Sequence, residues 1–95
     1  MTERRLIRLM SDYGVGWPLW EDGAMDPADF DLPVGLADRI SAWQEHFEVR
    51  FHYEDGWKTA EDAAAYAREG RELHRFLEQS IGGWADVRLD LWPVQ

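Results

Sequence analysis

Residues 85–93 read ADVRLDLWP, and this stretch decides the fold. Apolar and charged side chains alternate over residues 86–91, which is the two-residue period of a half-buried strand, and Pro93 ends the pattern. A single strand is not stable alone. The best partner is RRLIRLMS at residues 4–11, a short apolar run that is typical of a second strand. We therefore expect the two ends of the chain to pair in one sheet.

The charges on the two expected strands have opposite signs. Arg4, Arg5 and Arg8 lie on the first strand, and Asp86 and Asp90 lie on the second. Opposite charges that face each other on neighbouring strands stabilise a sheet by up to about 1 kcal/mol for each pair. We expect these arginines to lie opposite these carboxylates.

A first helix is expected from Pro33 to about residue 52. Its large apolar residues recur at steps of three and four, the spacing of one helical face; they are Leu36, Ile40, Trp43, Phe47 and Phe51. The end of this helix stays open, because residues 47–54 also alternate with the period of a strand. Residues 48–53 are therefore either helix or strand.

A second helix is predicted from a cap at Thr59, with Asp62 three residues on, to about Ser80. Its inward stripe consists of small and apolar residues: Ala63, Tyr66, Ala67, Gly70, Leu73, Leu77 and Ile81. A glycine in the middle of a helix costs about 1 kcal/mol relative to alanine. We expect the close approach of a bulky side chain such as Trp43 to explain Gly70.

These elements predict a small α+β domain over residues 1–95, with the order β-loop-α-α-β and two helices packed on a minimal two-stranded sheet. Residues 12–33 contain prolines and glycines and show no sustained periodicity, so they are expected to form a long loop. A short helical turn can start at Asp26 and Pro27. Loops of this length in a compact domain tend to carry function.

Composition limits the function classes. The chain has no cysteine, which excludes a disulfide scaffold, a thiolate zinc site and a thiol nucleophile. Ten basic and 19 acidic residues give a net charge of −9, which repels nucleic-acid phosphates and anionic lipid head groups. No stretch has the apolar length of a membrane helix or the pattern of a secretory signal. We expect a cytoplasmic protein with neither nucleic acid nor membrane as a partner.

No catalytic or metal site is expected. His46, His52 and His74 are not spaced as metal ligands usually are. The acidic residues 21–31 do not fit the calcium-loop template, no serine lies in a GxSxG turn, and no glycine-rich phosphate loop occurs. We predict a protein that is not an enzyme and needs no cofactor.

The loop contains the residues that we predict to bind a partner. They combine large aromatic rings with carboxylates: Tyr13, Trp17, Trp20, Glu21, Asp22 and Asp26. Aromatic anchors ringed by polar groups are typical of interface hot spots, but tryptophans also enlarge small cores, so Trp17 and Trp20 can be exposed or buried. Residues 12–38 hold seven acids and no base, a field that suits a basic partner.

Four other tryptophans are expected to be structural. Trp43 should lie in the core, since it falls on the apolar face of the first helix. Trp57, Trp84 and Trp92 stand at element boundaries, where an indole commonly closes the edge of a core.

The segments SDYGVGWPLW, DPADF, LADRISAWQEHF and YAREGRELHRFLEQSIG occur in this order between the expected strands. In this they resemble short acidic proteins common in actinobacteria. The similarity covers nearly the whole chain, and its most specific part is the DY…WPLW pattern at residues 12–20. That family brings no established activity or site, so the resemblance implies a bacterial single-domain protein and nothing about chemistry.

Strong negative charge, an acid-only segment and aromatic anchors together predict a small protein-binding module. We expect it to inhibit a basic partner protein in the manner of an immunity protein or antitoxin. One alternative is a DNA mimic that inhibits a nucleic-acid-binding defence protein, with its acids in two roughly parallel rows. Another is a ligand-binding protein or enzyme with a pocket walled by Trp17, Trp20 and Trp57. The partner's identity and the oligomeric state stay open.

Overall fold

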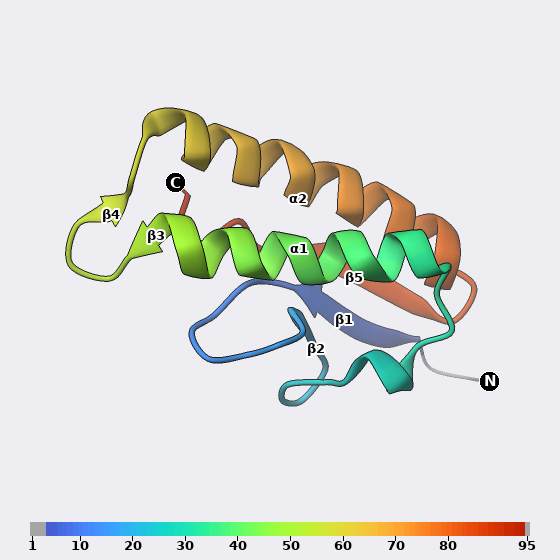
Figure 1. Ribbon diagram of the computed structural model, residues 1–95. Helices are drawn as coiled ribbons and strands as arrows, with labels where there is room; N and C mark the ends of the chain where they lie inside the picture. The colour runs from blue at the N-terminus through green and yellow to red at the C-terminus, as the bar shows by residue number, and fades with distance from the viewer. Residues whose placement is uncertain (1–3, 95) are drawn as a thin grey trace.

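The computed structural model describes residues 4–94, so the ends of the predicted domain, residues 1–3 and 95, lie outside the described part. Two helices lie on one side of a sheet, and a small hairpin projects at one end (Figure 1). In chain order the elements are β1 (Arg5–Leu9), β2 (Leu19–Trp20), the 3-10 turn η1 (Pro27–Asp29), α1 (Val34–Arg50), β3 (Phe51–His52), β4 (Gly56–Trp57), α2 (Ala60–Ile81) and β5 (Ala85–Leu89). The predicted α+β class is confirmed.

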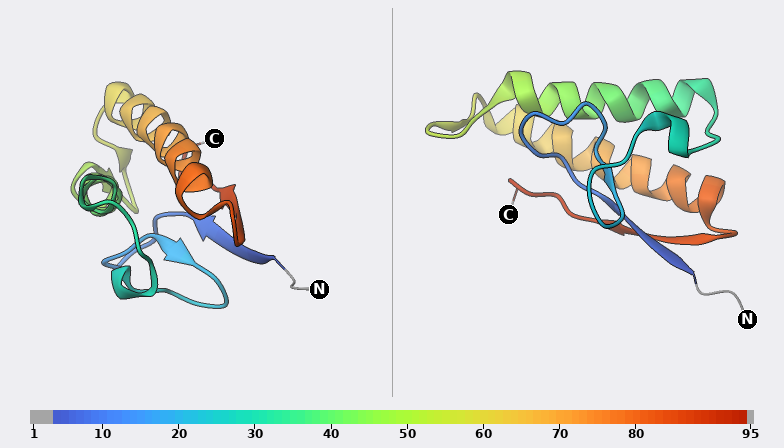
Figure 2. Two further views of the ribbon diagram at one scale, coloured as in Figure 1. Left: turned by 90° about the vertical axis from the view of Figure 1, so that its right-hand side faces the viewer. Right: turned by 90° about the horizontal axis from the view of Figure 1, so that it is seen from below.

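The sheet has three strands in the order β2-β1-β5, so the prediction of two strands was wrong. The third strand, β2, lies within the expected loop and is too short, at two residues, to show a periodicity. β1 pairs with β2 antiparallel and with β5 parallel. Each element in the series β1, β2, α1, α2 and β5 reverses the direction of the chain, and this returns β5 parallel to β1 (Figures 1 and 2).

The core lies between the sheet and the helices, as the end-on view in Figure 2 shows. Strand alternation turns Ile7 and Leu9 towards the helices. Both helices bury the stripes expected from their spacing, with two exceptions: Ala63 is only half-buried, and Phe51 is half-buried and belongs to β3. The buried side is formed by Leu36, Ile40, Trp43, Gln44, Phe47, Tyr66, Ala67, Gly70, Leu73, Leu77 and Ile81. The helical periodicity therefore predicted the core correctly.

The charged residues of the strands pair only partly as expected. The Arg4 Nε lies 3.0 Å from the Asp86 Oδ1, as predicted. Arg8, however, lies opposite Arg88, because the parallel register places it beside the fourth residue of β5. The expectation that Arg8 faces a carboxylate across this pair of strands was wrong.

The end of α1 combines the two alternatives left open by the sequence. The helix runs through Arg50, and Phe51 and His52 then form β3, which pairs antiparallel with β4. Gly56, the first residue of β4, has a φ of 79°, a left-handed conformation that favours glycine. Residues 48–50 are therefore helical and residues 51–52 are a strand.

Two local predictions about α2 are confirmed. The Thr59 Oγ1 accepts a hydrogen bond from the Asp62 N at 3.0 Å and caps the helix. A Cβ on Gly70 would lie 2.7 Å from the Leu91 Cδ2 and 3.0 Å from the Trp43 Cζ2. Gly70 therefore gives Trp43 room to pack.

Candidate functional site

The loop that joins β1 to α1 is held by specific hydrogen bonds. The Met10 N donates to the Pro18 O at 3.0 Å, and the Trp20 Nε1 donates to the Met10 O at 2.7 Å. On the other side the Gln44 Nε2, from α1, donates to the Asp12 O at 2.8 Å. These bonds tie the predicted site to both the sheet and the first helix.

Of the two loop tryptophans, one lies in the core and the other lies partly at the surface. Trp17 is only 4% exposed and belongs to the buried cluster that includes Leu36 and Ile40. Its ring centroid lies 6.2 Å from that of Phe30. Trp20 is half-buried. Trp17 therefore adds to the core and is not an exposed anchor, because the loop turns its indole under α1, whereas Trp20 keeps part of its ring on the surface.

The carboxylates of the segment are mostly free. Glu21 pairs with Arg5 at 2.6 Å, and this bond lowers the pKa of Glu21 and raises the pKa of Arg5. Arg5 thus binds the loop and not the carboxylates of β5, which corrects the pairing expected for it. Within the described residues, five exposed acids of this segment form no ion pair: Asp22, Asp26, Asp29, Asp31 and Asp38.

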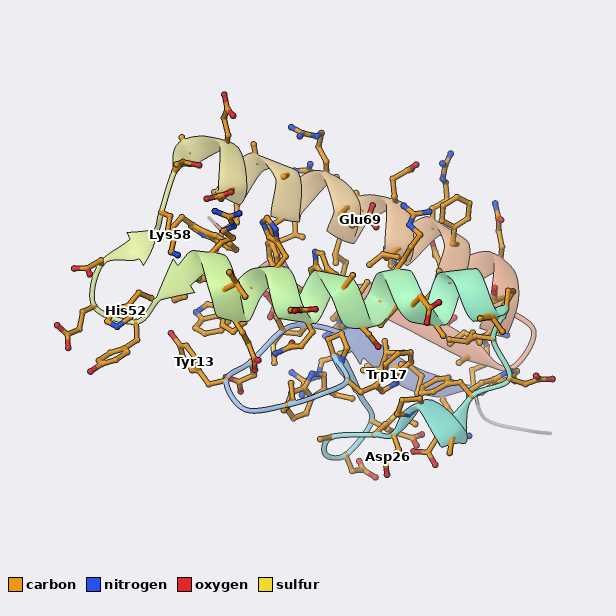
Figure 3. The ribbon with its side chains drawn as sticks, viewed as in Figure 1. Tyr13, Trp17, Asp26, His52, Lys58 and Glu69 are labelled. Carbon is orange, nitrogen blue, oxygen red and sulfur yellow. The ribbon has the colours of Figure 1, made fainter. Side chains whose placement is uncertain are left out.

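A hollow of about 490 Å³ lies between the two halves of the loop. One half contributes residues 14–17 and the other contributes residues 24–27, so that Trp17 and Asp26 line the same hollow. Figure 3 shows Tyr13 nearer to the hairpin, with Trp17 and Asp26 further along the molecule. The structure therefore separates the predicted residues: Trp17 and Asp26 line this hollow, and Tyr13 lies at a second place. Trp20 does not line the hollow, and Glu21 and Asp22 lie beside Arg5 and Arg8 of β1.

Tyr13 belongs to a partly exposed cluster of rings that we call the aromatic patch, consisting of Tyr13, Phe51 and Trp92. The ring centroids of Tyr13 and Trp92 are 5.7 Å apart, and the centroids of Phe51 and Trp92 are 6.2 Å apart. All three rings rest on the buried Phe47. Only Tyr13 was predicted as a binding residue, whereas Phe51 was expected on a helical face and Trp92 at the edge of the core. The three residues come from distant parts of the chain and share no local pattern that could link them.

Tyr66 holds the C-terminal side of the aromatic patch. Its O–H donates to the Trp92 O at 3.0 Å, and its ring stacks on Trp43 with a centroid separation of 4.4 Å. The Trp43 Nε1 donates to the Tyr66 O at 2.8 Å. Burial raises the pKa of Tyr66 to about 12, so the phenol stays protonated at neutral pH. The residue has a fixed structural role beneath the patch.

The alternative of a pocket walled by three tryptophans gains no support. The hollow beside Trp17 is lined by neither Trp20 nor Trp57. Trp57 instead packs against Tyr66 and Phe47, with centroid separations of 4.9 Å and 6.5 Å.

Residues 4–94 contain neither a metal-binding cluster nor a membrane-spanning helix. In this range no group of three or more histidine, cysteine, aspartate or glutamate side chains could hold a metal ion. No helix in the same range has both the length and the apolar content needed to cross a membrane.

A comparison with protein families identifies the chain. Residues 5–89 match the family described as Serratia CdiI immunity protein-like, and this range runs from the first residue of β1 to the last residue of β5. No curated protein matches the chain. The family match supplies a function that the resemblance to short acidic actinobacterial proteins lacked, and it confirms the prediction of a non-enzymatic, immunity-type inhibitor. The chain belongs to the Serratia CdiI immunity protein-like family and inhibits a cognate CDI toxin by binding it.

Proposed function

We propose that the chain neutralises a toxin domain with a basic contact surface, and that the loop between β1 and α1 receives this surface. The observation that carries the proposal is the set of five exposed carboxylates of residues 22–38, which form no ion pair within the described residues. Of the predicted residues, Trp20 and Glu21 directly precede this segment, and Asp22 and Asp26 belong to it. We place the interaction in the cytoplasm.

Charge would act mainly on the rate of encounter. Exposed acids that form no ion pairs create a negative potential that attracts and orients a basic partner, and salt screens this attraction over about 10 Å at 0.1 M ionic strength. The same field repels nucleic-acid phosphates. A basic protein is therefore the partner that this loop suits.

The hollow adds a shape that a partner can fill. Its volume of about 490 Å³ is large enough for one or two side chains, and Trp17 and Asp26 line it. A basic side chain that enters would contact an indole and approach a carboxylate. Trp17 thus retains a role as a lining residue, although it is not the exposed anchor that one alternative required.

Charge-neutral variants of the loop test the proposal. The double variant D22N/D26N changes the net charge from −9 to −7, because it removes two negative charges. The control variant E61Q/E72Q removes two exposed charges from α2 and reaches the same −7. Association with the cognate CDI toxin domain is measured by stopped flow at several salt concentrations.

We expect D22N/D26N to slow association at low salt by roughly threefold to tenfold and to reduce its dependence on salt. The control variant should stay within about twofold of the parent protein, because its charges are removed from α2 and not from the loop. Equal effects of the two variants would show that net charge, and not this loop, guides the toxin. No effect of either variant would overturn the proposal.

A further inference from the structure

We infer that the aromatic patch is a second contact for the toxin, and that it receives a cationic side chain, an arginine or a lysine. This inference rests on the proposed function, because it presumes a toxin with a basic contact surface. It concerns a different place on the molecule from the loop hollow and adds Phe51 and Trp92 to the predicted residues. Its basis is the joint placement of exposed rings and unpaired carboxylates.

The rings form a rigid, half-exposed surface. Tyr13 is 48% exposed and Trp92 is 38% exposed, yet both pack on the fully buried Phe47, with centroid separations of 5.3 Å and 5.6 Å. The two exposed rings meet edge to face at 85°. Tyrosine and tryptophan anchors of this kind dominate the energetics of many interfaces.

Two carboxylates accept hydrogen bonds from the backbone N–H groups of the residues that carry these two rings. The Asp12 Oδ1 accepts a hydrogen bond from the Tyr13 N at 2.7 Å, and the Asp90 Oδ1 accepts one from the Trp92 N at 2.9 Å. In each case the second carboxylate oxygen receives no hydrogen bond from the described residues. Tyr13 and Trp92 therefore each have a carboxylate held at their backbone N–H group.

A third carboxylate completes the arrangement from α1. The Glu48 Oε1 accepts hydrogen bonds from the Gly14 N at 3.2 Å and from the Gln44 Nε2 at 3.1 Å. Glu48 is exposed, and the ion pairs of the described residues include neither it nor the two aspartates beside the rings. Arg50 and Lys58, which flank the hairpin, also take no part in those ion pairs. The three carboxylates around the patch are therefore not neutralised by ion pairs within this part of the chain, and they outnumber the two cations of the hairpin.

This combination selects a cation over an apolar side chain. A guanidinium or ammonium group is attracted by the face of an aromatic ring, and it can pair at the same time with a fixed carboxylate. An apolar side chain would cover the rings but would remove water from the carboxylates without replacing its hydrogen bonds. A cationic side chain satisfies both parts of the surface.

The patch is also organised before binding. Phe47 is fully buried beneath it, and the hydrogen bond from the Tyr66 O–H holds the Trp92 O at 3.0 Å. A surface whose rings are already held in place loses little conformational entropy when a partner binds. We therefore expect the patch to slow dissociation, whereas the loop charges speed association.

Matched pairs of variants test this division. W92A removes a ring of the patch, and W84A removes a tryptophan of almost equal exposure, 37% against 38%, outside the patch. Y13A and Y53A form a second pair, since Tyr53 is exposed on the hairpin and, among residues 4–94, has a ring contact with His52 alone. Circular dichroism and urea unfolding first establish that each variant is folded, and dissociation of the toxin domain is then measured.

We expect W92A and Y13A to raise the dissociation rate by roughly tenfold or more, which is typical of hot-spot residues. W84A and Y53A should change it by less than about threefold. Y13F keeps the ring and should behave like the parent protein. If the patch variants dissociate no faster than their controls while D22N/D26N still slows association, the inference is overturned and the proposed function stands. If D22N/D26N has no effect while the patch variants dissociate faster, the proposed loop site fails and the patch stands.

A small-molecule comparison tests the cationic chemistry without the toxin, and it serves even if a patch variant does not fold. N-acetylarginine amide and the neutral isostere N-acetylcitrulline amide are titrated separately into the intact protein, and the indole N–H signal of Trp92 is followed by NMR. We expect arginine to shift this signal and added salt to reduce the effect. Equal shifts with citrulline, or no shift with either compound, would overturn the assignment of a cation.

Discussion

Replacing Gly70 by alanine tests how tightly the second helix packs on the core. Alanine is favoured over glycine inside a helix by about 1 kcal/mol, so local propensity alone predicts a more stable protein. The added Cβ would, however, lie 2.7 Å from the Leu91 Cδ2 and 3.0 Å from the Trp43 Cζ2. Ordinary carbon contacts are about 3.5–4.0 Å, so both neighbours would have to move.

The two neighbours differ in their freedom to move. Leu91 is half-buried and contacts the new atom with the end of a flexible side chain. Trp43 is buried, stacks on Tyr66 and donates its Nε1 hydrogen to the Tyr66 O, so it has little room. Overpacking a well-packed core costs about 1–3 kcal/mol. Subtracting the gain of about 1 kcal/mol leaves an expected net loss of roughly 1 kcal/mol.

Gly35 provides the matched control, because it also lies in a helix, near the start of α1, and a Cβ there would meet nothing within 4 Å. We expect G35A to stabilise the protein by up to about 1 kcal/mol and G70A to destabilise it by about 1 kcal/mol. Urea unfolding followed by tryptophan fluorescence measures both changes, and the melting temperature should fall by about 4–8 °C for G70A. If G70A is stabilised as much as G35A, the close packing of Trp43 against α2 is refuted.

Two further predictions concern stability. T59A removes the cap that accepts the Asp62 N–H and should lower the free energy of unfolding in urea by about 1 kcal/mol. T59S keeps a hydroxyl and should lower it by only a few tenths of a kcal/mol. Equal losses in the two variants would exclude the cap as the cause. The pKa of Tyr66 is about 12 in the fold and about 10 in an unfolded chain, so the unfolded state binds fewer protons between these values. The free energy of unfolding should therefore be unaffected by this group below pH 10 and should fall by about 2 kcal/mol as pH rises from about 10 to about 12. Y66F should lack this alkaline loss in urea unfolding measured across that range, and an equal loss in Y66F would assign it to other groups.

The candidate site was only partly predictable from the sequence. Tyr13 and the acids of the loop stood out because aromatic and acidic residues are concentrated in one segment. Phe51 and Trp92 could not be linked to Tyr13, since no periodicity relates residues so far apart in the chain. The two loop tryptophans illustrate the same limit, because the position of Trp17 under α1 depends on the path of the whole loop.

Local patterns by themselves determined the two helices, the two strands β1 and β5, the cap at Thr59 and the tight packing at Gly70. These features follow from side-chain spacing and backbone preferences within a few residues. Only the tertiary structure decided that β5 runs parallel to β1, that β2 joins the sheet, and that Tyr13, Phe51 and Trp92 meet on Phe47. Such contacts join distant segments, and they are selected by the packing of the complete core, which no short stretch of sequence contains.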